Sequence, residues 1–410
     1  MSDTPKLLKG IRVIEAATMV FVPSAAAIMA DFGAEVIKVE APGGGDIHRY
    51  GHLLPGMPES PVPYVFQVDN RNKKSIVLDL KKEEGREILG KMVATADVFL
   101  TSYRSKALKN LKMTYEDFQP LNPRLIYGYG SGYGEQGPEA DKPGYDMVCY
   151  WSRSGIEGQI FPMNDWLGPI PYGAGDHPSG MTLLTAIMFA LYAREKTGQG
   201  TKVSTSLLAC GAWANSNMIQ GQLCGARFLE RVPREQSYNF TFIYYLARDG
   251  RPLKLNINDQ KKDWEPFCRA VGRPDLIDDP RFATVDVRVK HMSELIALFD
   301  EAFGRHDLAY WDKVLSEHDI PFTSIRNYEE IAGDPQMAAT KVFTEVDHPR
   351  YGPFRTVDSP FKIEGQKKIK PGAAPVLGEH TQEVLTALGY PEEKIKDLLH
   401  RGIAVQKQGF

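Results

Sequence analysis

Apolar residues in the first half of the chain form short runs separated by longer segments with helical spacing. Runs typical of buried strands lie at 10–16, 35–40, 75–79, 97–100 and 125–129. Between them, 23–32 and 83–94 have the apolar spacing of helices. Strands that alternate with helices form parallel sheets covered on both faces, so the pattern predicts an α/β fold with a doubly wound parallel sheet.

Later in the chain the apolar positions become denser. Residues 183–191 are apolar at nearly every position, which predicts a helix buried on all sides. A strand at 203–206 and a second apolar helix at 207–223 are predicted to follow. Near the end of the chain, a short helix at 381–388 is predicted to precede a polar tail.

From residue 225 the pattern changes to a mixture of short strands and helices. A hairpin is predicted around Asp249 and Gly250, and helices at 262–271 and 293–303. We therefore expect a smaller α+β domain at 225–325, and a large domain made of 1–224 and 326–410.

Composition narrows the functional classes. The 410 residues carry 49 basic and 52 acidic side chains, and a net charge of −3 gives no overall attraction to nucleic acid or an anionic membrane. The four cysteines include no C-x-x-C pair, so reduced thiols are expected rather than a zinc site or disulfides. No apolar signal core begins the chain and no apolar segment approaches about 20 residues, so we expect a cytoplasmic protein.

Asp176 stands directly before the dense apolar segment. Asp is a preferred N-cap residue, and the unpaired N–H groups of a helix start favour a carboxylate anion. Capping aspartates are common and catalytic ones rare, so the local residues leave two roles open for Asp176, a simple cap or a covalent nucleophile. The neighbouring His177 is either a base or a solvated side chain.

Several well-known catalytic motifs are absent from the sequence. The glycines of 128–134 lack G-x-G-x-x-G spacing, and no Walker-type loop, H-E-x-x-H or G-x-S-x-G occurs. Histidines such as His48, His306 and His348 are scattered, which argues against a metal site. Nicotinamide, nucleotide-hydrolysing and serine-hydrolase functions are therefore disfavoured, and 128–134 is either a flexible loop or the lining of a pocket.

Basic residues gather around two predicted strands. Lys73, Lys74, Lys81 and Lys82 flank the strand at 75–79, and 102–106 follows the next one. Each group alone is typical of a solvated surface. Together with an aromatic ring at 103 that can stack on a purine, they suit a ligand with phosphates and an adenine, such as coenzyme A.

The chain resembles the CaiB/BaiF family, the class III CoA-transferases, which have a Rossmann-like large domain. Seven short stretches carry the resemblance in order along nearly the whole chain: 10–15, 31–40, 72–80, 142–146, 175–176, 197–200 and 377–381. Each is weak alone, and their order makes the resemblance specific.

The resemblance implies that Asp176 is the covalent nucleophile. It would attack an acyl-CoA thioester to give a mixed anhydride, which the CoA thiolate converts to an aspartyl-CoA thioester for transfer to an acceptor carboxylate. A carboxylate forms an anhydride comparable in energy to the thioester, so no ATP is required. Coenzyme A and acyl-CoA are then substrates, an acyl-CoA donor and a carboxylate acceptor are the partners, and no permanently bound cofactor is expected.

The same resemblance implies a set of coenzyme A contacts. By motif these are Val20, Phe21, Leu78, Lys81, Ser102, Tyr103, Arg104, Asn110 and Asp146. Ser102, Asn110 and Asp146 replace the Asn, Arg and Glu of the formyl-CoA transferase pattern. The glycine-rich loop of that enzyme, expected between 225 and 260, has no counterpart here, so other groups must stabilise the anhydride.

Within the family, 100–108 and 175–180 are most similar to members that act on 2-hydroxyacyl and aryl acids, such as phenyllactate and 2-hydroxyisocaproate. Aromatic residues between Tyr150 and Tyr172, including Phe161 and Trp166, agree with a bulky acyl group, although core packing explains them equally well. The expected substrate pocket contains Tyr145, Trp151, Tyr172 and His177. The family also forms intertwined, ring-shaped homodimers, and we expect one here.

The sequence leaves two alternatives open. A 2-methylacyl-CoA racemase of the same fold needs a His immediately before the Asp at 146, where this chain has Tyr145, and a phenol with a pKa near 10 is a poor base at neutral pH. A catalytically silent acyl-CoA-binding subunit would have no need of the carboxylate of Asp176.

Overall fold

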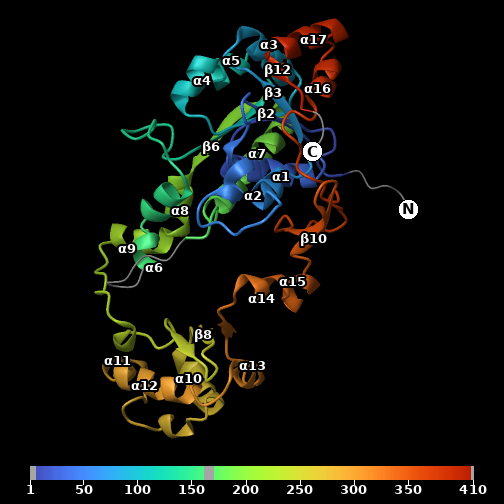
Figure 1. Cartoon of the computed structure of the whole chain (residues 1–410). Helices are drawn as coiled ribbons and strands as arrows, with labels where there is room; N and C mark the ends of the chain where they lie inside the picture. Colours follow the sequence, from blue (N-terminus) through green and yellow to red (C-terminus); the bar gives the residue numbers. More distant parts are fainter. Residues whose placement is uncertain (1–5, 161–169, 408–410) are drawn as a thin grey trace. The chain divides into compact units, whose positions relative to one another are not determined.

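The computed structural model describes residues 6–160 and 170–407 (Figure 1). Phe161 and Trp166 lie outside the described residues. The chain divides into two compact units, and Arg227–Gln336 makes up the described part of the smaller one. The remaining described residues, before and after that stretch, form the large unit.

The large unit is built on a seven-stranded sheet with the order β12-β3-β2-β1-β4-β5-β6. Its strands are β1 (Arg12–Ala16), β2 (Glu35–Glu40), β3 (Lys74–Leu78), β4 (Val98–Thr101), β5 (Ile126–Ser131), β6 (Thr201–Ser206) and β12 (Ala404–Val405). β1 to β6 are parallel, as predicted, and β12 pairs antiparallel with β3 at one edge. The strand order reverses between β1 and β4, where open α/β sheets bind ligands.

Helices cover both faces of this sheet, which explains why its central strands are almost continuously buried. Alternate residues of β1 enter opposite cores, Ile14 on one side and Val13 on the other. The Ile14 side is closed by α3 (Glu83–Ala94), α5 (Tyr115–Phe118), α16 (Thr381–Ala387) and α17 (Glu392–His400). The Val13 side is closed by α1 (Phe21–Asp31) and α7 (Asp176–Thr197) (Figure 1).

Shorter elements connect these layers. They are η1 (Ile47–Leu53), α2 (Tyr64–Asn70), α4 (Ser105–Leu111), η2 (Met147–Ser152), α6 (Glu157–Ile160), α8 (Leu207–Ala214), α9 (Ser216–Leu223), α15 (Pro335–Ala339), β10 (Phe343–His348) and β11 (Gly352–Val357). The single apolar helix predicted at 207–223 is wrong, because the helix is interrupted at Asn215. The predicted polar tail is also wrong, since it contains α17 and the edge strand β12.

The prediction of an all-round buried helix at 183–191 is wrong for one face. Leu183, Ile187 and Leu191 are buried in α7, whereas Phe189 is 72% exposed and Tyr192 is 64% exposed. In the adjoining α8, Trp213 is 81% exposed. An apolar surface on these two helices is therefore left uncovered within the single chain.

The smaller unit contains a three-stranded antiparallel sheet of β7 (Tyr244–Leu246), β8 (Pro252–Leu255) and β9 (Phe322–Ser324). Its helices are α10 (Gln260–Ala270), α11 (Val285–Lys290), α12 (Met292–Phe303), α13 (Leu308–Glu317) and α14 (Tyr328–Ala332), with short turns at η3 (Arg234–Gln236) and η4 (Pro274–Leu276). The hairpin predicted at Asp249 and Gly250 joins β7 to β8. Phe240, Phe267 and Phe299 form the centre of an aromatic core.

Candidate active site

The loop between β1 and α1 lies at the carboxyl end of the central strand. Met19 in this loop has a positive φ of 68°, and its backbone N–H donates to Asp46 Oδ1 at 3.0 Å. The preceding Thr18 N–H donates to Ser102 Oγ, which follows β4, at 3.3 Å. The two loops at the reversal of strand order are thus joined, and they carry Val20 and Ser102.

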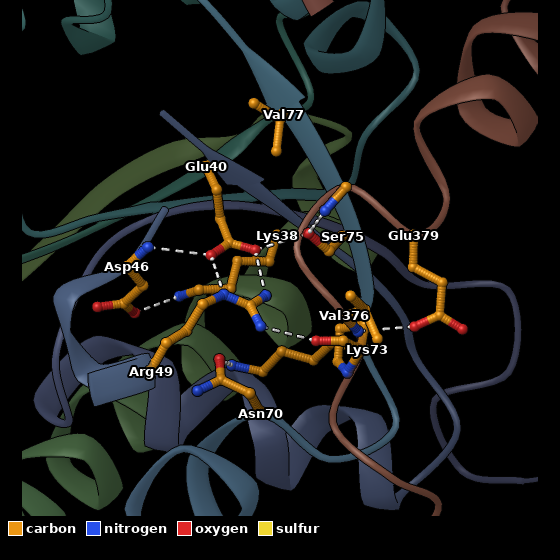
Figure 2. A network of polar contacts seen from close by, with 12 residues as sticks. Lys38, Glu40, Asp46, Arg49, Asn70, Lys73, Ser75, Val77, Val376 and Glu379 are labelled. Atoms are coloured by element: carbon orange, nitrogen blue, oxygen red, sulfur yellow. Dashed lines mark hydrogen bonds and ion pairs between the residues drawn. The ribbon is translucent and has the colours of Figure 1, made fainter. Parts of the chain in front are cut away.

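A buried set of charges, here called the Glu15 network, holds this loop in place. It consists of Glu15, Lys38, Asp46 and Lys73. Figure 2 shows three of its members, Lys38, Asp46 and Lys73. Lys38 Nζ contacts Glu15 Oε1 at 2.6 Å and Asp46 Oδ2 at 2.9 Å, and donates to the carbonyl of Ala17 at 2.9 Å. Lys73 Nζ contacts Glu15 Oε2 at 2.6 Å and donates to the carbonyl of Pro23 at 2.9 Å. Two lysines and two carboxylates balance in charge while fixing both ends of the loop.

Burial acts differently on the two lysines of the network. It works to lower the pKa of Lys38, but the carboxylates of Asp46 and Glu15 outweigh it, so this pKa lies above its ordinary value. For Lys73, burial outweighs the attraction of Glu15 and lowers the pKa to about 8. Lys38 is therefore the more firmly charged of the two.

A second group of polar contacts ties the C-terminal segment to the same edge of the sheet (Figure 2). Arg49 makes a two-pronged contact with Glu40, from Nε at 2.8 Å and Nη2 at 2.7 Å, and donates to the carbonyl of Pro375 at 2.9 Å. Ser75 Oγ donates to Glu40 at 2.6 Å and accepts from the Gly378 N–H at 2.9 Å. The segment around residue 377, singled out by its motif, thus packs beside the ends of β2 and β3.

Asp176 is the first residue of α7. The predicted N-cap role is not observed, because Gly175 occupies the cap position and no side chain caps the helix. The Gly175 N–H donates to Asp146 Oδ2 at 3.1 Å, and a Cβ on Gly175 would lie 2.2 Å from Asp146 Oδ1. A Cβ on Gly173 would lie 3.4 Å from Val20 Cγ1, so the segment before Asp176 lies against the β1–α1 loop.

The surroundings of Asp176 disfavour its charged form. Burial and the nearby carboxylates of Asp146 and Asp69 raise its pKa to about 7, against a lowering effect of His177. Within the described parts of the chain, no donor contacts the Asp176 carboxylate. Near neutral pH this side chain is therefore divided between carboxylate and carboxylic acid.

Asp69, at the end of α2, joins two histidines. Its Oδ1 lies 3.0 Å from His177 Nε2, and its Oδ2 lies 3.2 Å from His48 Nε2. His48 Nδ1 lies 3.3 Å from the Tyr172 hydroxyl, and these two rings stack with centroids 5.9 Å apart. We call Asp69, His48, His177 and Tyr172 the Asp69 cluster. Although burial opposes both shifts, the ion pair raises the pKa of His177 to about 9 and holds that of Asp69 below its usual range.

Comparison with known proteins identifies the chain. The sequence pattern of CoA-transferase family III matches residues 8–381. The chain belongs to this family. It is similar to (R)-2-hydroxy-4-methylpentanoate CoA-transferase of Clostridioides difficile, with 32% identity over 95% of this chain and 98% of the relative. It is also similar to cinnamoyl-CoA:phenyllactate CoA-transferase of Clostridium sporogenes, with 31% identity over 100% of both chains.

Solved structures agree with this family assignment. Rv3272 from M. tuberculosis has a TM-score of 0.79 and 27% identity, covering 92% of this chain and 98% of its own. A CAIB/BAIF family protein from Brucella suis has a TM-score of 0.79 and 26% identity, covering 94% of this chain and 100% of its own. The predicted family and enzyme class, a class III CoA-transferase, are thereby confirmed.

In this CoA-transferase the coenzyme A contacts expected from the family motifs have varied surroundings. Val20 and Phe21 are buried at the start of α1, and Ser102 and Tyr103 are half-buried after β4. Arg104 and Asn110 are exposed, and Arg104 Nη1 donates to the carbonyl of Asp141 at 3.4 Å. At the end of β3, Leu78 is fully buried in the core, while Lys81 is exposed. The structure thus links Ser102 to the loop that bears Val20, whereas the side chain of Leu78 is packed inside.

The expected substrate-pocket residues are also divided. Tyr172 and His177 belong to the Asp69 cluster, beside Asp176. Trp151 is half-buried and packs edge-on against Tyr150 at 5.5 Å between ring centroids, and Tyr145 is 63% exposed. Asp69 and His48 were missed by the sequence reasoning, because only the fold brings them to residue 177.

Metal-binding groups and helices that could cross a membrane are both absent from the described residues. In the ranges 6–160 and 170–407, no group of three His, Cys, Asp or Glu side chains is arranged to hold a metal ion. Among the helices of those same ranges, none has the length and apolar character required to cross a membrane.

Proposed function

We propose that the enzyme moves CoA from an acyl-CoA donor to a 2-hydroxy or aryl-substituted carboxylic acid, with Asp176 as the covalent nucleophile. The observation that carries the proposal is the carboxylate of Asp176, half-buried at the start of α7 and without a donor among the described residues. Such a carboxylate is poorly solvated and unpaired, which favours attack on an acyl carbon.

The chemistry balances without an external energy source. An Asp176 oxygen attacks the thioester carbonyl and the C–S bond breaks. CoA departs as the thiolate, and the acyl group stays on Asp176 as a mixed anhydride. The thiolate then attacks the Asp176 carbonyl and releases the donor acid. An acceptor carboxylate attacks the aspartyl-CoA thioester, a second anhydride forms, and the thiolate attacks the acceptor's acyl carbon to regenerate Asp176. The helix start of α7 can stabilise the negative charge that develops in each step.

Similarity and local structure support the substrate classes. The relatives named for 2-hydroxy-4-methylpentanoate and phenyllactate are similar to this protein over almost its whole length. The joined loops at Val20 and Ser102 stand at the reversal of strand order, which suits coenzyme A. Trp151 and Tyr172 offer aromatic surface for a bulky acyl group.

Chemical trapping tests the role of Asp176. The protein is incubated with a panel of acyl-CoAs that includes aryl and 2-hydroxyacyl compounds, treated with hydroxylamine or borohydride, and analysed by peptide mass spectrometry. We expect a hydroxamate or reduced product on Asp176, and none in Asp176→Asn. The exposed Asp141→Asn serves as a matched control with the product retained. An unmodified Asp176, with coenzyme A bound and α-proton exchange observed, would replace the transferase proposal with the racemase.

We also propose that two copies form the intertwined, ring-shaped homodimer that the family resemblance implies, in the cytoplasm. The exposed aromatic surface of α7 and α8 supports an interface there, because soluble single chains rarely leave such surfaces uncovered.

A further inference from the structure

Both ring nitrogens of His177 face hydrogen-bond acceptors. Nε2 lies 3.0 Å from Asp69 Oδ1, and Nδ1 lies 3.0 Å from the carbonyl oxygen of Gly173. A carbonyl oxygen and an ionised carboxylate can only accept, so each nitrogen must carry a proton. The geometry therefore requires an imidazolium at His177, which excludes the role of a free base that the sequence left open.

The partner carboxylate is firmly held. The Asp69 side chain is 3% exposed, and its second oxygen faces the fully buried His48. The Tyr172 hydroxyl can donate to His48 Nδ1, which leaves His48 Nε2 to donate to Asp69. Asp69 thus faces two histidines, and the cation at His177 compensates its buried charge.

The cation at His177 opposes the charges that face Asp176. These are the carboxylate of Asp146, which precedes η2, and that of Asp69 from α2. Tyr172 and Cys149 also lie within electrostatic reach of Asp176 as neutral groups. Burial and both carboxylates disfavour ionisation of Asp176, and His177 is the group that favours it.

We propose that Asp69 is a positioning residue of the transferase site, which holds His177 as a cation and thereby favours the ionised, nucleophilic form of Asp176. The effect on catalysis rests on the proposed role of Asp176, whereas the charge on His177 does not. With 46% of its side chain exposed, His177 also presents this cation to solvent.

Histidine NMR tests the charge directly. The nine histidines of the full-length enzyme are labelled at ring carbon Cε1, and His177→Gln identifies the resonance of His177. We expect a titration midpoint of about 9 in the native protein. In Asp69→Asn the midpoint should fall toward the ordinary value of about 6.5, and in Asp141→Asn it should stay unchanged. A native midpoint near 6.5, or one unaffected by Asp69→Asn, would overturn the proposal.

The pH dependence of CoA transfer supplies a second readout. In His177→Gln, the pKa of Asp176 should rise by about one, which predicts about a fivefold loss at pH 7 and recovery above pH 8.5. A merely structural role would give the same loss at every pH and would contradict the proposal. His177 is exposed, so this variant remains informative even if Asp69→Asn fails to fold. If Asp176→Asn retained full transfer activity while the NMR midpoints were as expected, the proposed function would be rejected. The positive charge on His177 would still be established.

Discussion

Two cross-strand ion pairs join β1 to β2, and they differ in their surroundings. Arg12 is paired in register with Glu35, and Glu15 with Lys38. Arg12 and Glu35 keep 41% and 35% of their side chains exposed, whereas Glu15 and Lys38 are completely buried. Water screens the first pair, while the second has only its network partners.

Removing one cation from each pair should therefore have different costs. Lys38→Met removes the ion pair of Asp46 and leaves Glu15 with Lys73, and we expect a loss of about 3–5 kcal/mol in the free energy of unfolding. Arg12→Met is the matched control, with an expected loss below about 1 kcal/mol. Urea unfolding followed by circular dichroism measures both. Equal losses would show that the buried network contributes no more than the surface pair.

At the residue scale the sequence indicated only part of the site. Asp176 and His177 were singled out because they adjoin a motif and an apolar helix. Asp69 and His48 have no such signal, since 21 residues separate them from each other and 108 separate Asp69 from His177. Only the packing of α2, η1 and α7 creates their hydrogen bonds, and single-residue chemistry does not predict that packing.

The approach of α7 to α1 is the element-scale feature that positions Asp176. Gly180, one turn into α7, allows it, because a Cβ there would lie 2.1 Å from Ser24 Oγ and 2.7 Å from the carbonyl oxygen of Phe21. The carbonyl oxygen of Phe21 belongs to the backbone, so it cannot move aside as a flexible side chain could. The start of α7 is thus tied to the loop that carries Val20.

Gly180→Ala should therefore separate the two helices and displace Asp176. We expect a destabilisation of about 1–3 kcal/mol and a fall in kcat, measured by thermal unfolding and by transfer kinetics. Gly90→Ala in the middle of α3 is the control, because its Cβ would meet only Leu121 at 3.6 Å. That variant should gain about 0.5–1 kcal/mol in stability with unchanged kcat. Native kcat in Gly180→Ala would show that the close approach does not position Asp176.

Elements of the large sheet were predictable where both faces are buried. β2 and α3 begin and end at the predicted residues, because β2 is buried along nearly its whole length and α3 packs one apolar face against the sheet. β12 has two residues, too few for a period, and α17 buries only Ile395 and Leu398. The polar tail was therefore predicted wrongly. Its helix and strand form because a few apolar residues pack against the core of the large sheet, and those residues make no pattern of their own.

At the scale of the whole molecule, the exposed aromatics of α7 and α8 bear on assembly. The apolar density of 183–191 predicted complete burial, yet Phe189 and Tyr192 are exposed in the single chain. An apolar pattern predicts that a surface is covered, but it does not tell whether the same chain or another one covers it. The error in that prediction is therefore itself an indication of a partner surface.

A second copy of the chain is the proposed partner, and charge placed on this surface should weaken the pairing. We expect the native protein to sediment as a dimer at micromolar concentration, and Trp213→Glu to shift the population toward monomer, because burying a carboxylate without a partner is costly. Tyr328→Glu is the matched control, since Tyr328 is 77% exposed on α14 of the smaller unit. Analytical ultracentrifugation distinguishes the species. A native protein that sediments as a monomer would reject the homodimer, and an undisturbed dimer in Trp213→Glu would place its interface away from α8.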